Sequence, residues 1–300
     1  MIRVEPSRTA QLGGTTVRRA LPRREQRTVG AWCFADHIGP TTVPTDSGTE
    51  GPGGIGSHPH IGLQTVTWLL SGSLLHRDSL GSEQRITPGE LNLMTAGHGV
   101  AHAEESLTPE GGVVHGIQLW VAQPEQTRAG AAAFEHHGEL PRLELDHGTA
   151  TILVGELLSL RSPARADTDH FGAELRLRPG STSLPLRKGH EHALIVLDGA
   201  ITADDTRLVP GEVGLIDEGP DELVMQTEEA SLVMFLGGTP FGRKLHMWWN
   251  FVGFDRAEID DAYDAWREGS DRFGPTGSEL GRIEISPPPW RSSHRSSDPG

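Results

Sequence analysis

The sequence predicts an all-β protein made of two small barrels in tandem, with one short helix near the C-terminus. Short runs of β-branched and aromatic residues recur along the chain between turns of Gly and Pro, a pattern typical of antiparallel barrels and jelly rolls. The 300 residues include 38 Gly, 21 Pro and a single Tyr. A weak internal repeat aligns residues 68–90 with 195–212, so we expect a duplicated barrel rather than one large sandwich.

The amino-acid composition limits the kinds of molecule that the protein is expected to bind. Lys and Arg together number 26 against 41 Asp and Glu, which gives a net charge of −15 with neutral histidines. A general electrostatic affinity for nucleic acid or anionic membrane is therefore not expected. The single cysteine, Cys33, cannot form an internal disulfide, and no apolar run has the length of a signal segment or a membrane span. We expect a cytoplasmic protein that binds neither nucleic acid nor membrane directly.

The first barrel is expected over residues 1–125. The stretch Trp32–Pro40 alternates like a strand and ends on Gly-Pro, and Thr41–Gly56 is rich in Thr, Gly and Pro and reads as a loop. Further strands are expected at 63–70, 74–78, 91–94 and 115–122, separated by turns such as Pro88-Gly89.

The second barrel is expected over residues 147–275, after a connection at 126–146 that is poor in large apolar residues. Its strands are expected near 151–158, 173–177, 193–197, 208, 213–216 and 232–236. Asp255 to Glu258 has the form of a capping box, and the apolar residues that follow share one face, so a helix is predicted over 255–268. Residues 286–300 are rich in Pro, Ser and Arg, which predicts a disordered tail.

The chemistry of the chain is concentrated in two motifs, His58-Pro59-His60 and His102-Ala103-Glu104. Side chains at positions i and i+2 of a strand point to the same face. The second motif begins 44 residues after the first, about the length that two or three antiparallel strands need to bring the pairs face to face. We therefore predict one transition-metal site with His58, His60, His102 and Glu104 as ligands.

Three imidazoles and one carboxylate leave one or two positions of an octahedral ion open, unlike a closed structural zinc site. Such a site can bind and orient a substrate and dioxygen. Mixed nitrogen and oxygen ligation suits iron, nickel, copper, manganese or cobalt alike. Glu104 is also the candidate catalytic residue, because a carboxylate beside the open position can take a proton from an incoming hydroxyl.

Other histidines and aromatic residues are expected to have structural roles. Four histidines are expected to make ordinary hydrogen bonds, with support of a metal ligand as the lesser alternative: His37, His76, His98 and His115. His190 and His192 repeat the His-x-His spacing at the equivalent place in the second barrel, but residues 217–225 offer no partner histidine, so this pair is expected to be on the surface or vestigial. Trp248 and Trp249 are expected to pack in the core or between the barrels, with the lining of an aromatic pocket as the lesser alternative.

Several separated motifs, in order, carry a family resemblance. They are RR-x-LP, VG-x-WCFADHIGP, HPH-x-G-x-x-TVTWLLSG, HRDS, PGELNLMTAGHGVAHAE and GIQLWV. Together they resemble pirin, a member of the cupin superfamily with two jelly-roll barrels (a bicupin). The match is dense from Arg18 to Gln123 and looser to Phe273. The family commonly has Arg and Glu where this chain has Ile61 and Gln64, so the first motif is less polar here.

The resemblance implies a metal, iron(II) first among the candidates and zinc among the others, in the N-terminal barrel on His58, His60, His102 and Glu104. It implies a second barrel that has lost its metal. Bacterial members are associated with quercetin 2,3-dioxygenase activity, in which dioxygen opens the heterocyclic ring of a flavonol and carbon monoxide leaves. Animal members act as nuclear cofactors of transcription, so a non-enzymatic, metal-dependent regulatory protein with a protein partner is the alternative function.

Overall fold

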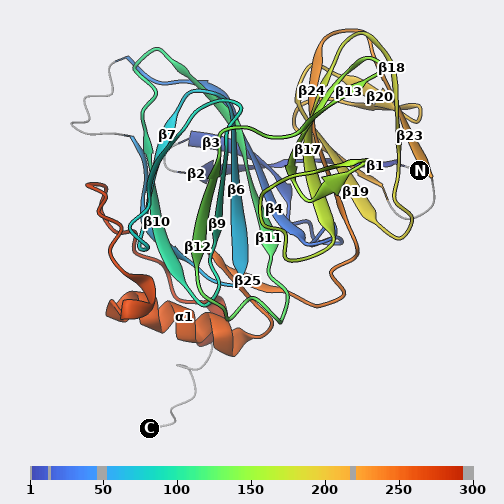
Figure 1. Cartoon of the computed structure of the whole chain (residues 1–300). Helices are drawn as coiled ribbons and strands as arrows, with labels where there is room; N and C mark the ends of the chain where they lie inside the picture. Colours follow the sequence, from blue (N-terminus) through green and yellow to red (C-terminus); the bar gives the residue numbers. More distant parts are fainter. Residues whose placement is uncertain (1, 13–14, 46–52, 217–220, 293–300) are drawn as a thin grey trace.

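The computed structural model describes residues 2–12, 15–45, 53–216 and 221–292. Two barrels lie side by side, each formed by a seven-stranded and a four-stranded antiparallel sheet, and a helix lies beneath the first barrel (Figure 1). This confirms the prediction of an all-β chain with two barrels and a short C-terminal helix.

The first barrel has a large sheet in the order β12-β9-β6-β11-β4-β3-β2 and a small sheet in the order β5-β10-β7-β8. The strands of the large sheet are β2 (Arg8–Leu12), β3 (Thr15–Leu21), β4 (Trp32–Thr42), β6 (Leu63–Ser71), β9 (Leu91–Thr95), β11 (Val113–Ala122) and β12 (Ala133–His137). Those of the small sheet are β5 (Gly54–His60), β7 (Leu74–Asp78), β8 (Glu83–Ile86) and β10 (Val100–Ser106).

The second barrel repeats this plan with the orders β1-β22-β19-β24-β17-β14-β13 and β18-β23-β20-β21. Its large sheet contains β1 (Ile2–Pro6), β13 (Arg142–Leu145), β14 (Gly148–Val154), β17 (His170–Leu177), β19 (Glu191–Asp198), β22 (Glu212–Ile216) and β24 (Ser231–Gly238). Its small sheet contains β18 (Gly180–Pro185), β20 (Ile201–Ala203), β21 (Thr206–Leu208) and β23 (Glu222–Thr227). Two hairpins complete the strands: β15 (Glu156–Leu157) with β16 (Leu160–Arg161), and β25 (His246–Trp248) with β26 (Phe251–Gly253).

The barrels share an apolar core where their large sheets meet. Trp32 of β4 and Trp68 of β6 are fully buried in a cluster that also contains Ile195 and Leu236 of the second barrel. The Trp32 indole donates a hydrogen bond to the Phe171 carbonyl at 2.9 Å, and the Trp68 indole donates to the Glu174 carboxylate at 2.8 Å. Each tryptophan therefore links the two barrels through the packing of its ring and through one hydrogen bond from its indole N–H.

Two of the expected domain boundaries are wrong. Residues 2–6 form β1, which pairs with β22 and belongs to the second barrel rather than to a unit 1–125. The expected connection at 126–146 contains β12, which pairs with β9 of the first barrel, and β13, which pairs with β14 of the second. These short strands are half-buried and carry little apolar signal, and local sequence does not identify the partner of a strand.

The C-terminal helix packs on the first barrel, whereas the sequence placed it with the second. Helix α1 (Arg256–Glu268) begins as predicted, with the Asp255 carboxylate accepting from the Glu258 amide, and ends at Gly269 in the left-handed conformation. Its predicted apolar face is buried, but it packs against Ile61 and Ala101 of the first barrel. The helix therefore follows the second barrel in sequence but packs on the first.

Residues after the helix continue to cover the first barrel. The 3-10 turn η1 (Asp271–Phe273) is followed by a segment that hydrogen-bonds alongside β5, through Ser57 N to Gly281 O and Ile283 N to Ser57 O. The short helix α2 (Pro289–Ser292) places Trp290 against α1, where its indole donates to Asp260 at 3.0 Å. The predicted disorder is thus wrong for residues 286–292, and residues 293–300 lie outside the described residues.

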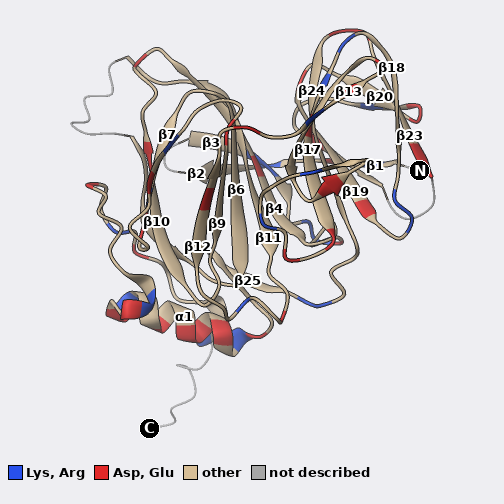
Figure 2. Ribbon diagram, viewed as in Figure 1, with Lys and Arg blue, Asp and Glu red and all other residues tan. Residues whose placement is uncertain are grey.

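Figure 2 shows charged residues of both signs closely spaced along α1, and others on the loops and on several strands. No helix in the described part of the chain is both long and apolar enough to cross a membrane.

Candidate metal centre

The two predicted motifs lie on neighbouring strands. β5 and β10 pair antiparallel, with His102 directly opposite His58 and Val100 opposite His60. The register shifts between His102 and Glu104, where β5 carries one extra residue before His58. Such a bulge twists the strand and redirects the side chains beside it. The predicted pairing of the two motifs is therefore present.

Three imidazoles meet inside the barrel. His58, His60 and His102 are 5%, 1% and 2% exposed, and each offers a ring nitrogen within 4.8 Å of the others. The Nε2 atoms of His60 and His102 are 3.0 Å apart. Two nitrogens about 2.1 Å from one shared ion have this separation when they meet it at a right angle. The three residues fit a first-row divalent metal.

The backbone sets the tautomer of His58. Its Nδ1 lies 2.7 Å from the Gly56 carbonyl oxygen. A carbonyl only accepts, so Nδ1 carries the proton and donates it. The Nε2 lone pair of His58 is then available to a metal.

A second chain of hydrogen bonds sets the tautomer of His102. Asp78 Oδ2 lies 3.1 Å from His76 Nε2, and His76 Nδ1 lies 3.2 Å from His102 Nδ1. Because the carboxylate accepts, His76 donates through Nε2 and accepts through Nδ1, so His102 donates through Nδ1 and presents Nε2 to the site. The Phe134 ring of β12 stacks on His76 at 4.3 Å between centroids. His76, expected to have an ordinary structural role, therefore supports a candidate ligand.

Burial determines the protonation states of the side chains at this site. It lowers the pKa of His58 to about 4 and holds the pKa values of His60 and His102 well below the ordinary value, with the neighbouring histidines adding to the effect. The imidazoles are therefore neutral at pH 7, the form that ligates metal. Burial also raises the pKa of Glu104.

Glu104 lines the same cavity but is not part of the three-imidazole group. Its Oε1 accepts a long hydrogen bond of 3.5 Å from the Thr67 hydroxyl, which donates more strongly to Gln118 Oε1 at 2.9 Å. The structure thus brings together three of the four predicted ligands and places the fourth in the same cavity.

The cavity has a volume of about 470 Å³ and an aromatic wall. Phe34 and Trp120 stack at 3.9 Å between centroids, and Trp120 meets the His60 ring edge to face at 5.5 Å. Trp249, in the turn of the β25–β26 hairpin, also lines the cavity and is 39% exposed. Its φ of 54° is costly for a bulky side chain. The expectation that Trp249 packs in the core is wrong, and the lesser alternative, that it lines an aromatic pocket, is what the structure shows.

The Asp78–His76–His102 chain leads to a prediction for metal affinity. Replacing Asp78 by Asn lets the amide donate to His76, which reverses the His76 tautomer and removes the acceptor for His102 Nδ1. We expect the affinity for metal to fall by roughly 10- to 100-fold, as measured by competition with a chelator.

The matched control for Asp78→Asn is Glu83→Gln. Glu83 is the partner of Arg77 in an exposed ion pair on the adjacent strand, so this variant should leave metal affinity unchanged. Equal affinities of Asp78→Asn and wild type would show that the hydrogen-bond chain does not control the ligand.

The second His-x-His pair is not on the surface. His190 and His192 are 5% and 2% exposed, so that part of the expectation is wrong. His192 lies at the start of β19, whose counterpart in the first barrel is β6 rather than the ligand strand β5, so the two His-x-His motifs are not equivalent. The His192 ring stacks on Phe235, and His190 pairs with Asp169 at 3.2 Å. Within the described residues, the second barrel contains no group of three metal-ligating side chains.

Buried histidines outside the metal centre predict a pH dependence of stability. Burial lowers the pKa of both His170 and His192 from 6.5 to about 4. Between these values the unfolded chain binds protons that the folded chain does not. The free energy of unfolding should therefore fall as the pH drops from about 6.5 to about 4. Urea denaturation of chelator-treated protein across this range measures it, and His192→Phe, which cannot take up a proton, should show a shallower fall.

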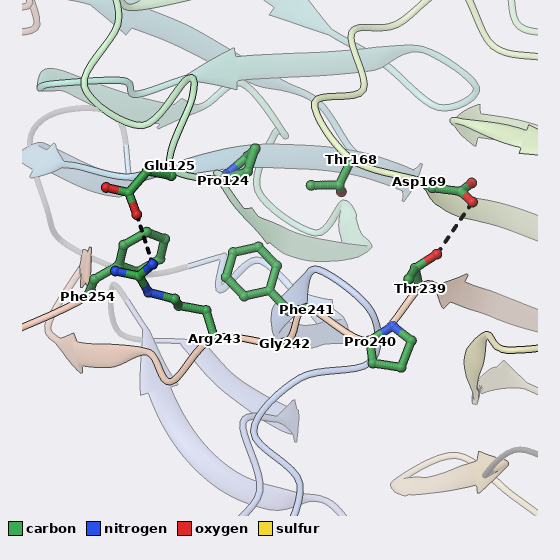
Figure 3. Close-up of a pocket in the computed structure, with 10 residues that line it drawn as sticks. All are labelled: Pro124, Glu125, Thr168, Asp169, Thr239, Pro240, Phe241, Gly242, Arg243 and Phe254. Carbon is green, nitrogen blue, oxygen red and sulfur yellow. Dashed lines mark hydrogen bonds and ion pairs between the residues drawn. The ribbon is translucent and has the colours of Figure 1, made fainter.

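A separate cavity of about 390 Å³ lies between the barrels (Figure 3). Phe241 lies in its centre, and Glu125 and Arg243 form an ion pair at 3.0 Å on one side. On the other side, Asp169 contacts Thr239 and pairs with Arg187 at 3.0 Å. The charges of this cavity are paired within the protein, and none of the predicted metal ligands lines it.

Comparisons with known proteins agree with this architecture. A family model described as Pirin matches residues 14–121, and one described as the pirin C-terminal cupin domain matches residues 172–274. A protein of Pseudomonas aeruginosa named "Putative quercetin 2,3-dioxygenase" is 43% identical over 288 residues, which cover 95% of this chain and 90% of the relative.

Solved structures show the same fold. A crystal structure of a quercetin 2,3-dioxygenase from Acinetobacter baumannii matches with a TM-score of 0.90 and 38% identity, covering 96% of each chain. The bacterial pirin YhhW from Escherichia coli, solved in complex with nickel(II), matches with a TM-score of 0.63 and 17% identity, covering 80% of this chain and all of that one.

Proposed function

The chain belongs to the pirin family, and from that membership we propose that it is a metal-dependent dioxygenase of the quercetin 2,3-dioxygenase type, acting on a flavonol. The observation that carries the proposal is the buried group His58, His60 and His102, which lines an aromatic cavity. The names of the relative from Pseudomonas aeruginosa and the structure from Acinetobacter baumannii support the same reaction.

We assign the metal to His58, His60, His102 and Glu104, with iron(II) as the first candidate. The nickel complex of the Escherichia coli relative makes nickel a direct alternative; copper, manganese, cobalt and zinc also accept these donors. A bound divalent ion would supply Lewis acidity and an open coordination position for a chelating substrate and dioxygen.

The residues of the chain have distinct roles in this proposal. The Asp78–His76 pair holds the His102 ring in one orientation. Phe34 and Trp120 supply apolar ring surface to the cavity, which an aromatic substrate can contact. Glu104, which lines the same cavity, accepts the proton of the flavonol hydroxyl as the substrate binds.

The test is aerobic turnover of quercetin by protein loaded separately with each metal. Elemental analysis gives the metal content, and loss of the flavonol absorbance band with release of carbon monoxide gives the reaction. We expect near-stoichiometric metal and a loss of the band that stops without oxygen. Glu104→Gln should lower the turnover number by roughly 10²- to 10⁴-fold.

Loss of the band at the same rate in metal-loaded and metal-free protein would contradict the proposal. Stoichiometric metal without turnover in any loaded form would also overturn the dioxygenase assignment, and would favour the non-enzymatic alternative, in which the metal controls binding of a protein partner. The expected cytoplasmic location stays a prediction.

A further inference from the structure

A larger cavity adjoins the metal cavity inside the first barrel. Its volume is about 620 Å³, against about 470 Å³ for the metal cavity. Five residues line both spaces: Leu12, Gly54, Ile55, Glu104 and Gln118. We call the larger space the inner chamber. Because Glu104 and Gln118 stand on the common wall, a molecule that fills the inner chamber reaches the polar groups of the metal centre at one end.

The wall of the inner chamber is mainly apolar. Side chains from five strands of the barrel line it: Val17, Ile38, Leu69, Leu74 and Val114. Ile38, Leu74 and Val114 are only half-buried, although they lie on barrel strands. The two sheets therefore leave apolar surface uncovered between them, and covering it with a ligand is favourable.

The charges of the chamber select against an anionic occupant. Its charged lining residues are two carboxylates, Glu104 and Glu110, and no Lys or Arg of the described chain lines it. Glu104 is at the metal end. A neutral, apolar body with its polar head towards Glu104 and Gln118 matches this distribution, and volumes of this size hold ligands of drug-like dimensions.

We propose that the inner chamber binds the aromatic body of the substrate, so that the substrate spans both cavities with its chelating head at the metal centre. This assignment rests on the proposed function for the identity of the head group. In this arrangement Val114 and the residues around it limit the size of the substrate. The aromatic wall and Trp249 then lie on the opposite side of the reacting centre. The competing arrangement places the aromatic body against Trp249, outside the chamber.

The test uses flavone, which lacks the 3-hydroxyl and so lacks the chelating pair of a flavonol, with chelator-treated protein. Val114→Trp adds a large ring inside the chamber. Val113→Trp is the matched control, because Val113 is the preceding residue of the same strand, is 40% exposed and does not line the chamber. We expect Val114→Trp to weaken flavone binding by roughly tenfold or more and Val113→Trp to bind like wild type.

A second variant tests the same chamber with a smaller substitution, so that the test does not depend on correct folding of Val114→Trp. Leu74→Phe fills the chamber from the opposite sheet by a smaller change, and it should also weaken flavone binding. Circular dichroism establishes that each variant is folded, and elemental analysis after reloading establishes that the metal centre is intact.

The possible results of these binding experiments distinguish a failure of this inference from a failure of the proposed function. Folded Val114→Trp and Leu74→Phe variants that bind flavone like wild type would overturn it. Loss of flavone binding in Trp249→Ala, with both chamber variants unaffected, would place the aromatic body at the mouth of the metal cavity. Flavone binding that depends on Val114, in a protein that does not turn over quercetin, would support the chamber and remove only the dioxygenase assignment.

Discussion

Replacing His102 by Ala should remove the metal from the purified protein. His102 lies directly opposite His58, and its Nε2 is 3.0 Å from that of His60, so it is the central member of the three-imidazole group. Structural zinc sites with four ligands release roughly 10–16 kcal/mol on binding. By that measure one ligand contributes about 3 kcal/mol, and its loss weakens binding by roughly 100- to 1000-fold. Elemental analysis of the variant should find only background metal, and quercetin turnover should be lost with it.

The control for His102→Ala is His98→Ala. His98 is an exposed histidine in the turn that leads into β10, outside the three-imidazole group, so its removal should leave the metal content at the wild-type level. Wild-type metal affinity in folded His102→Ala would mean that the predicted centre is not where the protein binds metal. Equal losses in both variants would point to a general effect of the turn on folding.

Replacing Trp32 by Ala should destabilise the whole protein by roughly 3–5 kcal/mol. Trp32 is fully buried in the core that the two barrels share, meets the His170 ring edge to face at 5.2 Å, and donates to the Phe171 carbonyl. The substitution leaves a cavity between the barrels and removes the indole donor to the Phe171 carbonyl. Urea denaturation of the chelator-treated protein, with the free energy of unfolding extrapolated to water, measures the effect.

Trp32→Phe distinguishes packing from hydrogen bonding. The Phe ring retains most of the buried apolar area but cannot donate to Phe171, so we expect a loss of about 1–2 kcal/mol. A loss below about 1 kcal/mol in Trp32→Ala would indicate that contacts outside the shared core hold the barrels together.

Local patterns predicted the parts of the fold and site that depend on local chemistry. Strand period placed His58 with His60 and His102 with Glu104, and the structure brings the two strands together. The capping box predicted the start of α1, and its apolar spacing predicted the buried face. Each of these features is set by residues a few positions apart, which is the range over which a single sequence is informative.

The features that the sequence did not predict, or offered only as the lesser alternative, depend on which distant strands are neighbours. His76 contacts His102 because β7 pairs with the other edge of β10, and nothing in either strand specifies that partner. Trp249 reaches the metal cavity because the β25–β26 hairpin returns to the first barrel, where Ile61 bridges to Phe251. The expectation for His190 and His192 failed for a related reason, because equal spacing on β19 did not make that strand the counterpart of β5.

The exchange of terminal segments between the barrels has a consequence for how the protein is made. Strand β1, synthesised first, completes the sheet of the second barrel, and Trp249, Asn250 and Ile283, synthesised late, complete the wall of the metal cavity in the first. A fragment ending near residue 125 would therefore lack the cover of β5 and expose a strand edge to aggregation. We therefore expect the two barrels to fold as one unit, with the metal cavity closed only when translation is almost complete.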